Sequence, residues 1–505
     1  MPDTRFPRRY FFFGPLLAGA VPASGFGSVA SLRALGYKPF YDKLNVAAVG
    51  CGGRGGAILN EAAETENLVA MCDVDENRAA GNYGKFPKAP KYKDFRVMFD
   101  KEAKNIEAVT IGIPDHMHAT VALAAMQRGI HVYLEKPLTR TAWEARLMKD
   151  AAAKYKVATQ MGNQGYSHES IRVAAEIVWS GEIGDVTEVH VSSSPGTHPT
   201  ALQQLPSEAS VPSNLDWDLW LGGASMRAYA PDHYAPYNWR GFFDFGTGQI
   251  GNWGIHSMGP VNLALQLTAP TSVELIKSEG DSKWTFPSRA VVKFEFPARG
   301  GMGPVAVYWH DSTRPGDAES YRVPGMENET VLPQSSNLSP KGRPMGNVEG
   351  GGGRRPRDPN APRWGAGGPG VKVFADNRVA SQPGVLSSNG AVFVGTKGVM
   401  ATVSRGEGVH LLPASRWQDY KLPPQLLTRS PGHMRDWIRY CKGGDPSCSH
   451  FGIAGPYTEW MLLGAIAMRV PGKLLWDSKA LRFTNSAEAN KWVRPTFRPG
   501  WELKL

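Results

Sequence analysis

The chain has 505 residues, of which 42% are hydrophobic and 20% charged, so wholesale disorder is excluded and a sizeable core can be buried. At about 150 residues per domain, this length predicts two or three domains. The net charge of +10 permits an anionic ligand, but no basic block exceeds the short stretch 354–357, so no nucleic-acid partner is expected. Four cysteines exclude a disulfide scaffold. Cys51 and Cys72 are predicted to be core residues, whereas Cys441 and Cys448 could form a bridge in an oxidising compartment.

The first residues are typical of an export signal. Arg8 and Arg9 precede a run of aromatic residues, and the apolar stretch 14–23 ends in small residues. Twin arginines before a weak hydrophobic run predict a twin-arginine signal over 1–35 and a periplasmic protein exported in the folded state. An ordinary basic N-terminus is the alternative. No stable membrane span is expected, because no segment approaches about 18 uninterrupted apolar residues.

Between residues 44 and 164, short apolar stretches alternate with helical patterns. Strands are predicted at 44–49, 68–72, 106–113, 130–134 and 156–161, and helices at 57–63, 120–128 and 142–154. This alternation is typical of βαβ units in a parallel sheet that is covered on both faces. We therefore predict an N-terminal α/β domain over 44–164 with a doubly wound parallel sheet.

The pattern changes after residue 165. Helices are predicted at 169–179, 433–441 and 458–470, strands at 186–192, 290–296 and 305–309, and a hairpin at 392–403. The longer strands predict a C-terminal α/β domain over 165–475 with an open, largely antiparallel sheet, followed by a tail over 476–505. Residues 312–389 are poor in apolar periodicity and rich in Gly and Pro, which indicates a surface insertion that is flexible at its middle.

A glycine-rich turn separates the first predicted strand from the first helix. Gly50, Gly52 and Gly55 form a G-x-G-x-x-G pattern. Gly50 makes the tight turn, Gly52 admits a pyrophosphate and Gly55 allows the helix and strand to pack closely. Asp73 ends the next strand about twenty residues on, where an acid accepts hydrogen bonds from ribose hydroxyls. Together they predict a Rossmann domain that binds a nicotinamide dinucleotide, with its phosphates at the helix N-terminus.

The choice between the two nicotinamide dinucleotides rests on charge. Asp73 would repel a 2′-phosphate, so NAD is favoured. Arg54 and Arg78 can offset that repulsion, so NADP stays possible.

Four further segments point to one family. They are 113–118 (Ile-Pro-Asp-His-Met-His), 135–137 (Glu-Lys-Pro), 162–164 (Gly-Asn-Gln) and 248–256 (Gly-Gln-Ile-Gly-Asn-Trp-Gly-Ile-His). With the glycine turn they resemble the Gfo/Idh/MocA oxidoreductases over 44–267, and more faintly over 433–477. The resemblance implies an open sheet that faces the nicotinamide, sugar or polyol substrates, and a homo-oligomer, dimer or tetramer, assembled through that sheet. It is closest to exported bacterial members.

The resemblance also implies roles for particular residues. Lys136 lies beside the nicotinamide and the reacting hydroxyl, Pro137 follows a cis peptide, and His256 matches the catalytic histidine of the family. The expected cofactor-binding residues are Gly50, Gly52, Arg54, Gly55, Asp73, Pro114, His118, Glu135, Lys136 and Asn163. The expected substrate-binding residues are Gln164, Tyr237, Trp239, Arg240 and Asn252.

The chemistry of oxidising a carbinol suits Lys136 and His256. A neutral histidine can remove the hydroxyl proton, and a lysine ammonium can stabilise charge on the forming carbonyl oxygen. The sequence departs from the family at Asn252, where many members have an aspartate, so the usual Asp–His relay is absent. His256 then acts alone or with Tyr237, His233 or another hydroxyl, or Asn252 only orients the substrate.

The stretch 214–253 is rich in aromatic residues. Because sugar C–H faces stack on aromatic rings, we expect Tyr237, Trp239 and Arg240 to form a substrate lid; the alternative is that most rings form core or a subunit interface. His116 and His118 have a metal-like H-x-H spacing, but no carboxylate or cysteine set completes a site, so no metal is predicted.

Three functions remain open from the sequence. The first is an NAD(P)-dependent oxidoreductase that acts on a sugar, glycoside or cyclic polyol, with a tightly held cofactor. The second is an NAD-dependent glycosidase that oxidises transiently and eliminates the aglycone, which the similarity of 256–260 (His-Ser-Met-Gly-Pro) to a segment of those enzymes favours. The third is a non-catalytic carbohydrate-binding protein.

Overall fold

The structure is a computed structural model that describes residues 42–313, 320–332 and 383–505 apart from 419. The expected export signal and the middle of the expected insertion lie outside these residues. No helix in the described part is long and apolar enough to cross a bilayer.

The first sheet has six parallel strands in the order β3-β2-β1-β4-β5-β6. The chain runs outward from β1 to β3 and then returns to β4 on the other side of β1, so the strand order reverses between β1 and β4. The carboxyl ends of strands at such a reversal form the ligand crevice of doubly wound sheets. The predicted fold of the first domain is confirmed. Its elements are β1 Asn45–Val49, α2 Gly53–Ala63, β2 Asn67–Cys72, α3 Glu76–Lys85, β3 Lys91–Tyr92, α4 Phe95–Glu102, β4 Ala108–Ile111, α5 Asp115–Met126, β5 His131–Leu134, α6 Ala142–Tyr155 and β6 Thr159–Met161.

The second sheet has nine strands in the order β13-β12-β11-β7-β10-β9-β8-β14-β15. Among its described strands, β7 and β10 pair in parallel and the other neighbours are antiparallel, which confirms the predicted open, largely antiparallel sheet. The strands are β7 Val186–Ser192, β8 Ser272–Glu279, β9 Arg289–Phe296, β10 Val305–Asp311, β11 Gly390–Gly395, β12 Val399–Val403, β13 Gly408–Leu412, β14 Lys473–Asp477 and β15 Arg482–Phe483.

Helices and short turns of helix also occur in the chain after β6. They are η2 Gln164–Ser167, α7 Glu169–Trp179, α8 Trp217–Leu221, η3 Asn238–Gly241, the π-helical η4 Ile250–Gly254, α9 Ile255–Ser257, α10 Gly259–Ala264, η5 Ala414–Trp417, α11 His433–Cys441, α12 Phe451–Ala467 and α13 Ala487–Asn490. The predicted bounds of α7 and α11 agree with the structure.

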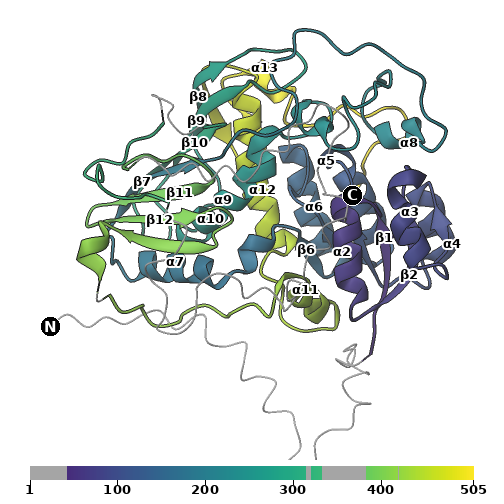
Figure 1. The fold of residues 1–505 in the computed structure, drawn as a ribbon, viewed down its shortest axis with the longest axis horizontal. Coiled ribbons are helices and arrows are strands. Elements are labelled where there is room, and N and C mark those ends of the chain that lie inside the picture. Colours follow the sequence, from purple (N-terminus) through teal and green to yellow (C-terminus); the bar gives the residue numbers. More distant parts are fainter. Residues whose placement is uncertain (1–41, 314–319, 333–382, 419) are drawn as a thin grey trace, which may run out of the picture.

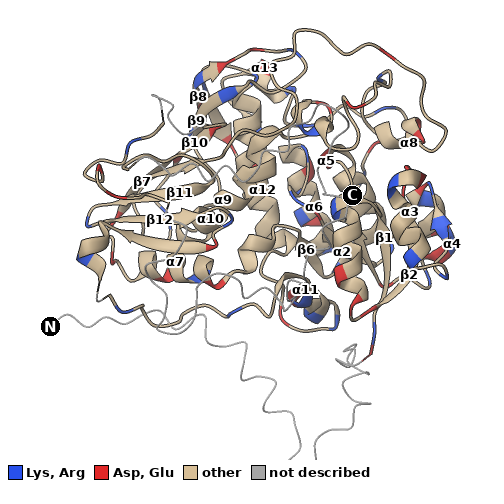
Figure 2. Cartoon of the chain, viewed as in Figure 1, with Lys and Arg blue, Asp and Glu red and all other residues tan. Residues whose placement is uncertain are grey.

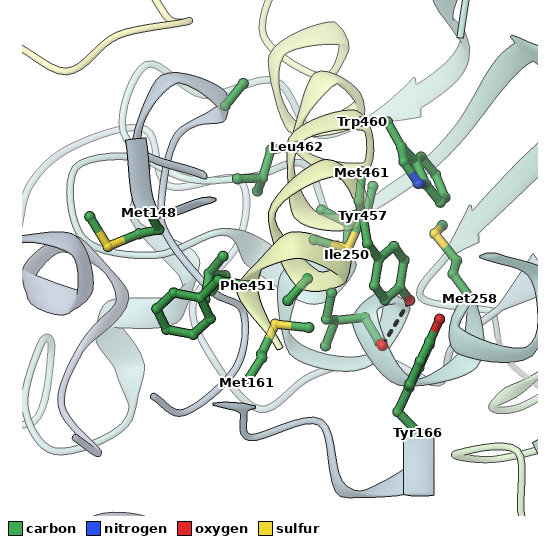
Figure 3. Packing of buried hydrophobic residues seen from close by; sticks show 14 of the residues in the cluster. Met148, Met161, Tyr166, Ile250, Met258, Phe451, Tyr457, Trp460, Met461 and Leu462 are labelled. Carbon is green, nitrogen blue, oxygen red and sulfur yellow. Dashed lines mark hydrogen bonds between the residues drawn. The ribbon is translucent and has the colours of Figure 1, made fainter. Parts of the chain in front are cut away.

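Helix α12 lies between the two domains and is almost free of charged residues (Figures 1 and 2). It packs on α6 of the first domain and on β8 and β9 of the second. A Cβ at Gly455 would lie 3.1 Å from the Ala145 carbonyl oxygen, so this glycine lets the two helices approach closely. On the other side, the Trp460 ring lies 5.3 Å from the Phe294 ring, and the Tyr457 hydroxyl donates to the Ile255 carbonyl at 2.8 Å. Figure 3 shows Trp460 and Tyr457 among the buried residues around α12.

Helix α11 completes the core of the first domain although it follows the second sheet in sequence. Met434, Trp437, Ile438 and Cys441 form a buried cluster with residues of β1, α2, β4 and β5. The Trp437 and Tyr133 rings meet edge to face at 5.6 Å. The buried ion pair between Lys442 and Glu66 ties the end of α11 to the loop before β2 at 3.0 Å.

Several predicted boundaries differ from the structure. Helices α2, α5 and α12 begin at Gly53, Asp115 and Phe451, four to seven residues before the predicted starts. The first turns contain Gly, His or Pro, which are poor helix formers, and α5 and α12 are buried on nearly all sides, so no amphipathic period marks them. Helices α3 and α4 and strand β8 were not predicted.

The described parts of the expected insertion (312–389) and of the expected tail (476–505) pack against the rest of the protein. Val323, Met326 and Leu332 join a buried cluster with residues of β11 to β13. Residues 476–505 include part of β14, then β15 and α13, and the Arg498 guanidinium binds Asp218 at 2.6 Å. All four cysteines are free, including Cys441 and Cys448.

Candidate active site

The glycine turn has the geometry that its sequence predicts. Gly50 has φ +85°, and a Cβ on it would lie 2.4 Å from the Gly112 carbonyl oxygen. A Cβ on Gly52 would lie 2.8 Å from the Arg78 carbonyl oxygen, and one on Gly55 would lie 2.2 Å from the Gly50 carbonyl oxygen. Larger side chains are therefore excluded, and the amides at the start of α2 stay open to a pyrophosphate.

Asp73 follows β2 at the edge of the same crevice. Its carboxylate accepts hydrogen bonds from the backbone N–H groups of Cys51, at 2.7 Å, and Asp75, at 3.0 Å. Burial raises the pKa of Asp73, and these two hydrogen bonds oppose that rise. Each carboxylate oxygen keeps a free lone pair, so Asp73 can still accept a hydrogen bond from a ribose hydroxyl.

One cavity of about 440 Å³ joins the glycine turn to the second domain. A volume of this size is within the range of ligand-binding pockets. The expected site residues that line it are Gly50, Gly52, Arg54, Asp73, Pro114, Glu135, Lys136, Gln164, Tyr237, Trp239, Arg240, Asn252 and His256. The cavity thus brings together residues from seven separate segments of the chain.

Lys136 follows β5 and precedes Pro137 through the expected cis peptide bond. Its ammonium donates to the carbonyl oxygen of Asn252 at 2.7 Å and to the side-chain oxygen of Asn252 at 2.9 Å. Burial lowers the pKa of Lys136 to about 7; Arg240 and Arg405 lower it further, whereas Glu135 and Asp115 oppose the shift. The lysine can therefore gain and lose a proton near neutral pH.

Glu135 organises the wall of the cavity next to Lys136. Its Oε1 accepts from Arg54 Nε at 2.8 Å and from Gln164 Nε2 at 3.1 Å. Arg54 is therefore paired with Glu135. Arg78 also lines the cavity and lies near Asp73, and it has no ion pair among the described residues.

His256 lies in α9, directly after the π-helical turn η4. Its Nδ1 is buried and has no hydrogen-bond partner among the described residues. Burial, followed by the positive charges of Lys136 and Arg405, holds the pKa of His256 well below the usual 6.5. The imidazole is therefore neutral at physiological pH.

Three expected cofactor-binding residues do not line the cavity. Gly55 lies against Gly50, as its packing function requires. The ring nitrogens of His118 lie 2.8 Å from the Pro137 carbonyl oxygen and 2.9 Å from the Ile113 carbonyl oxygen, so His118 supports the backbone behind Lys136. Asn163 is buried, and its side-chain amide has no partner among the described residues.

The rings of the aromatic segment 214–253 are divided between a buried cluster and the cavity lining. Most of its rings form a buried cluster, including Trp217, Tyr234 and Phe242. Trp220, Tyr237, Trp239 and Trp253 also line the cavity. The Asn252 amide lies 3.3 Å from the Tyr237 hydroxyl, whereas His233 is exposed and outside the cavity lining, so it does not assist His256.

The lining residues missed from the sequence include Lys93, Trp253 and Arg405. Arg405 lies in the turn between β12 and β13, 149 residues after His256, and no local pattern marks it as a site residue. The described residues contain no cluster of three or more His, Cys, Asp or Glu able to hold a metal. His116 instead contacts the Trp220 carbonyl oxygen at 2.9 Å.

A doubly wound sheet with a glycine turn, an acid after its second strand, and a lysine and a histidine in the same crevice defines a two-domain dinucleotide-binding oxidoreductase. Residues 44–163 match the model of an oxidoreductase family with an NAD-binding Rossmann fold, and residues 169–288 match the C-terminal alpha/beta domain of that family. The chain belongs to the Gfo/Idh/MocA oxidoreductase family, and its first domain is NAD-binding.

Individual relatives match only part of the chain. A glycosyl hydrolase family 109 protein of Solibacter usitatus is 27% identical over 183 residues, which are 34% of this chain and 41% of that protein. The inositol 2-dehydrogenase of Salmonella paratyphi B is 32% identical over 152 residues, 29% of this chain and 45% of the enzyme. The chain thus spans less than half the length of these relatives.

A solved structure shows the same fold over a longer stretch. The WlbA dehydrogenase from Bordetella pertussis, in complex with NADH and UDP-GlcNAcA, aligns with a TM-score of 0.53. The alignment covers 86% of this chain and 99% of that one, at 12% identity.

Proposed function

We propose that the protein is an NAD-dependent oxidoreductase that acts on a hydroxyl group of a sugar, glycoside or cyclic polyol. The observation that carries this proposal is the single cavity lined both by the glycine turn and by Lys136 and His256. The bound dinucleotide supplies the acceptor or donor of the hydride. Aromatic faces and polar groups in the same cavity suit a polyhydroxylated ring.

In this proposal Lys136 moves the hydroxyl proton. A general base works best when its pKa is near the working pH, and the pKa of Lys136 is about 7. The neutral amine accepts the proton as the carbinol is oxidised, and the ammonium returns it in the reverse direction. This assignment differs from the expectation that His256 is the base, because the lowered pKa makes His256 a weak one. The neutral imidazole instead orients the hydroxyl.

A matched pair of lysine variants tests the proposal. Lys136→Met is expected to reduce kcat by about 10²–10⁴-fold, because it removes the proton acceptor. Lys91→Met is the control, since Lys91 also donates to a backbone carbonyl, that of Pro87 at 3.0 Å, but is exposed and outside the cavity. The readout is NADH formation over a panel of sugars and cyclic polyols, with released nucleotide measured after denaturation. Failure of the protein to bind any nicotinamide nucleotide would refute the proposal.

The NAD-dependent glycosidase is a second candidate because two observations favour it. Asn252 occupies the position at which the family resemblance implies an aspartate, and 183 residues of the chain are 27% identical to a glycosyl hydrolase family 109 protein. Release of nitrophenol from nitrophenyl glycosides without net NADH would support the glycosidase. Steady accumulation of NADH from an unsubstituted sugar would support the dehydrogenase.

The cellular setting is part of the proposal. We propose export by the twin-arginine route, on the basis of Arg8 and Arg9, and a homo-oligomer of two or four copies. Because free NAD is scarce outside the cytoplasm, an exported enzyme would hold its cofactor tightly and recycle it with a second carbonyl substrate. Nucleotide that remains with the purified protein after extensive dialysis would support this view.

A further inference from the structure

The end of the cavity next to Lys136 contains more positive than negative charge. The carboxylate of Glu135 is paired with Arg54 at 2.8 Å, and the buried carboxylate of Asp115 accepts from the Thr247 hydroxyl at 2.7 Å. Arg240 and Arg405 also line this end, and neither has an ion pair within the described part of the chain. Asp115 and Glu135 act on Arg240 electrostatically, but neither guanidinium is within ion-pair distance of a described carboxylate.

Arg240 is held in a fixed orientation by aromatic rings. Its guanidinium carbon lies 4.2 Å from the ring centres of both Tyr237 and Trp239. Nη1 donates to the Tyr237 carbonyl oxygen at 3.2 Å, and no other described residue accepts a hydrogen bond from this guanidinium. Its remaining N–H groups are therefore free to bind an oxyanion with the paired geometry that arginine favours.

Arg405 approaches the same place from the second sheet. The turn between β12 and β13 carries it, and its backbone is in close contact with Gly165. Its guanidinium lies 5.5 Å from the ring of Trp253, the residue next to Asn252. Arg405 lowers the pKa of both Lys136 and His256, so its charge acts at the catalytic pair.

We propose that Arg240 and Arg405 bind an anionic substituent of the substrate, so that the preferred substrate is a sugar with a carboxylate or sulfate group. This proposal rests on the proposed function and further specifies that the substrate is negatively charged. The pyrophosphate of a dinucleotide does not account for these two arginines, because it lies at the glycine turn.

The charge of such a substrate also affects Lys136. Four charged groups influence its pKa: Arg240 and Arg405 lower it, and Glu135 and Asp115 raise it, whereas the nearby His256 is neutral. A bound anion offsets the two arginines and raises the pKa of Lys136 in the complex. The pH at which kcat rises is then higher for an anionic sugar than for its neutral counterpart.

Binding to the NAD-saturated full-length protein tests the proposal directly. The probes are matched sets: glucose, glucuronate and glucose 6-sulfate; the galactose series; and mannose with mannuronate. Titration calorimetry should show that an anionic member of at least one set binds about tenfold or more tightly than its neutral partner. The uronate and the sulfate ester distinguish the two sources of negative charge.

Arginine variants assign the effect to the proposed residues. Arg240→Gln/Arg405→Gln is expected to abolish the preference for the anionic probe. Arg416→Gln is the matched control, because Arg416 is exposed, lies 4.8 Å from the Trp417 ring and is outside the cavity. The control should keep the full preference, and circular dichroism should show that all variants fold.

Three results would overturn the proposal. The first is equal binding of neutral and anionic probes in every set, and the second is a preference for the anionic probe that survives in the double variant. The third is a double variant whose only loss is the binding of NAD. These results are distinct from failure of the proposed function. Anion-selective binding without oxidation of any sugar would refute the oxidoreductase and leave the arginine site supported.

Discussion

The protonation state of Lys136 depends in part on Asn252, which accepts hydrogen bonds from its ammonium. The amide oxygen of Asn252 accepts from the ammonium at 2.9 Å but carries no charge, so the burial of Lys136 is poorly compensated and its pKa is lowered to about 7. Where many relatives have an aspartate, the same position would hold a carboxylate. Asparagine in this chain thus favours a lysine that can act as a base at neutral pH.

We expect Asn252→Asp to shift the pH profile of sugar oxidation upward. In the wild type, kcat/KM should rise as the pH increases through about 7, because the ammonium then becomes an amine. A carboxylate next to the ammonium stabilises the charged form and raises the pKa of Lys136, by about 1–3 units. The variant should therefore lose activity at pH 7 and regain it near pH 9, measured as initial rates of NADH formation.

Asn252→Ala is the control for this shift, because it removes the amide and adds no charge. Its kcat/KM can fall, but its pH profile should not move upward. Coincident profiles for the wild type and Asn252→Asp would contradict the assignment of Lys136 as the titrating group.

At the residue scale, local motifs identified the glycine turn and the central polar residues of the cavity. Gly50, Asp73 and Lys136 were predicted because each lies in a short pattern at the end of a predicted strand, and His256 because segment 248–256 resembles a family motif. Arg405 could not be predicted, since only the pairing of β11, β12 and β13 brings that turn to the site. The pKa of Lys136 could not be predicted either, because it depends on burial by both domains.

Whole elements were predictable where one face is polar. Helices α7 and α11 have a polar and an apolar side, and their bounds were predicted correctly. Helix α12 is buried on both sides and has Pro456 in its second turn, so its first two turns gave no helical pattern. Strand β8 was missed because its burial does not alternate along its length.

The contact between α6 and α12 includes an ion pair whose carboxylate is buried. Arg146 binds both carboxylate oxygens of Glu459 at 2.7 Å, and the Glu459 side chain is 6% exposed. Arg146→Met should leave this carboxylate without a partner and lower the free energy of unfolding by about 2–3 kcal/mol, less than for a fully buried pair because Arg146 is partly exposed. Burial raises the pKa of Glu459, so the loss should be smaller at pH 5 than at pH 8.

Urea denaturation at both pH values measures this effect. The control is Arg128→Met, since Arg128 pairs with Asp100 at the same distance of 2.7 Å, but Asp100 is 68% exposed. Such a surface pair contributes about 0–1 kcal/mol. Equal losses in the two variants would show that burial of Glu459 does not determine the strength of the α6–α12 contact.

At the scale of the whole molecule, the order of elements in sequence differs from their grouping in space. Helix α11 follows the nine-stranded sheet but packs in the core of the first domain, and α12 contacts both domains. The two domains therefore share core elements, and neither has a complete core without the C-terminal part of the chain. We infer that the protein unfolds as one cooperative unit.

Trp437→Ala tests this inference, because Trp437 is fully buried in α11 and contacts Tyr133 of the first sheet. The cavity should cost about 3–5 kcal/mol of unfolding free energy. If the domains unfold together, the midpoint of the entire transition falls, and far-ultraviolet circular dichroism and tryptophan fluorescence report the same midpoint. NAD at a hundred times its Kd should raise the stability of the whole chain by about 2.7 kcal/mol in both proteins. Two separate transitions, of which NAD shifts only one, would instead show that the domains unfold independently despite the shared helices.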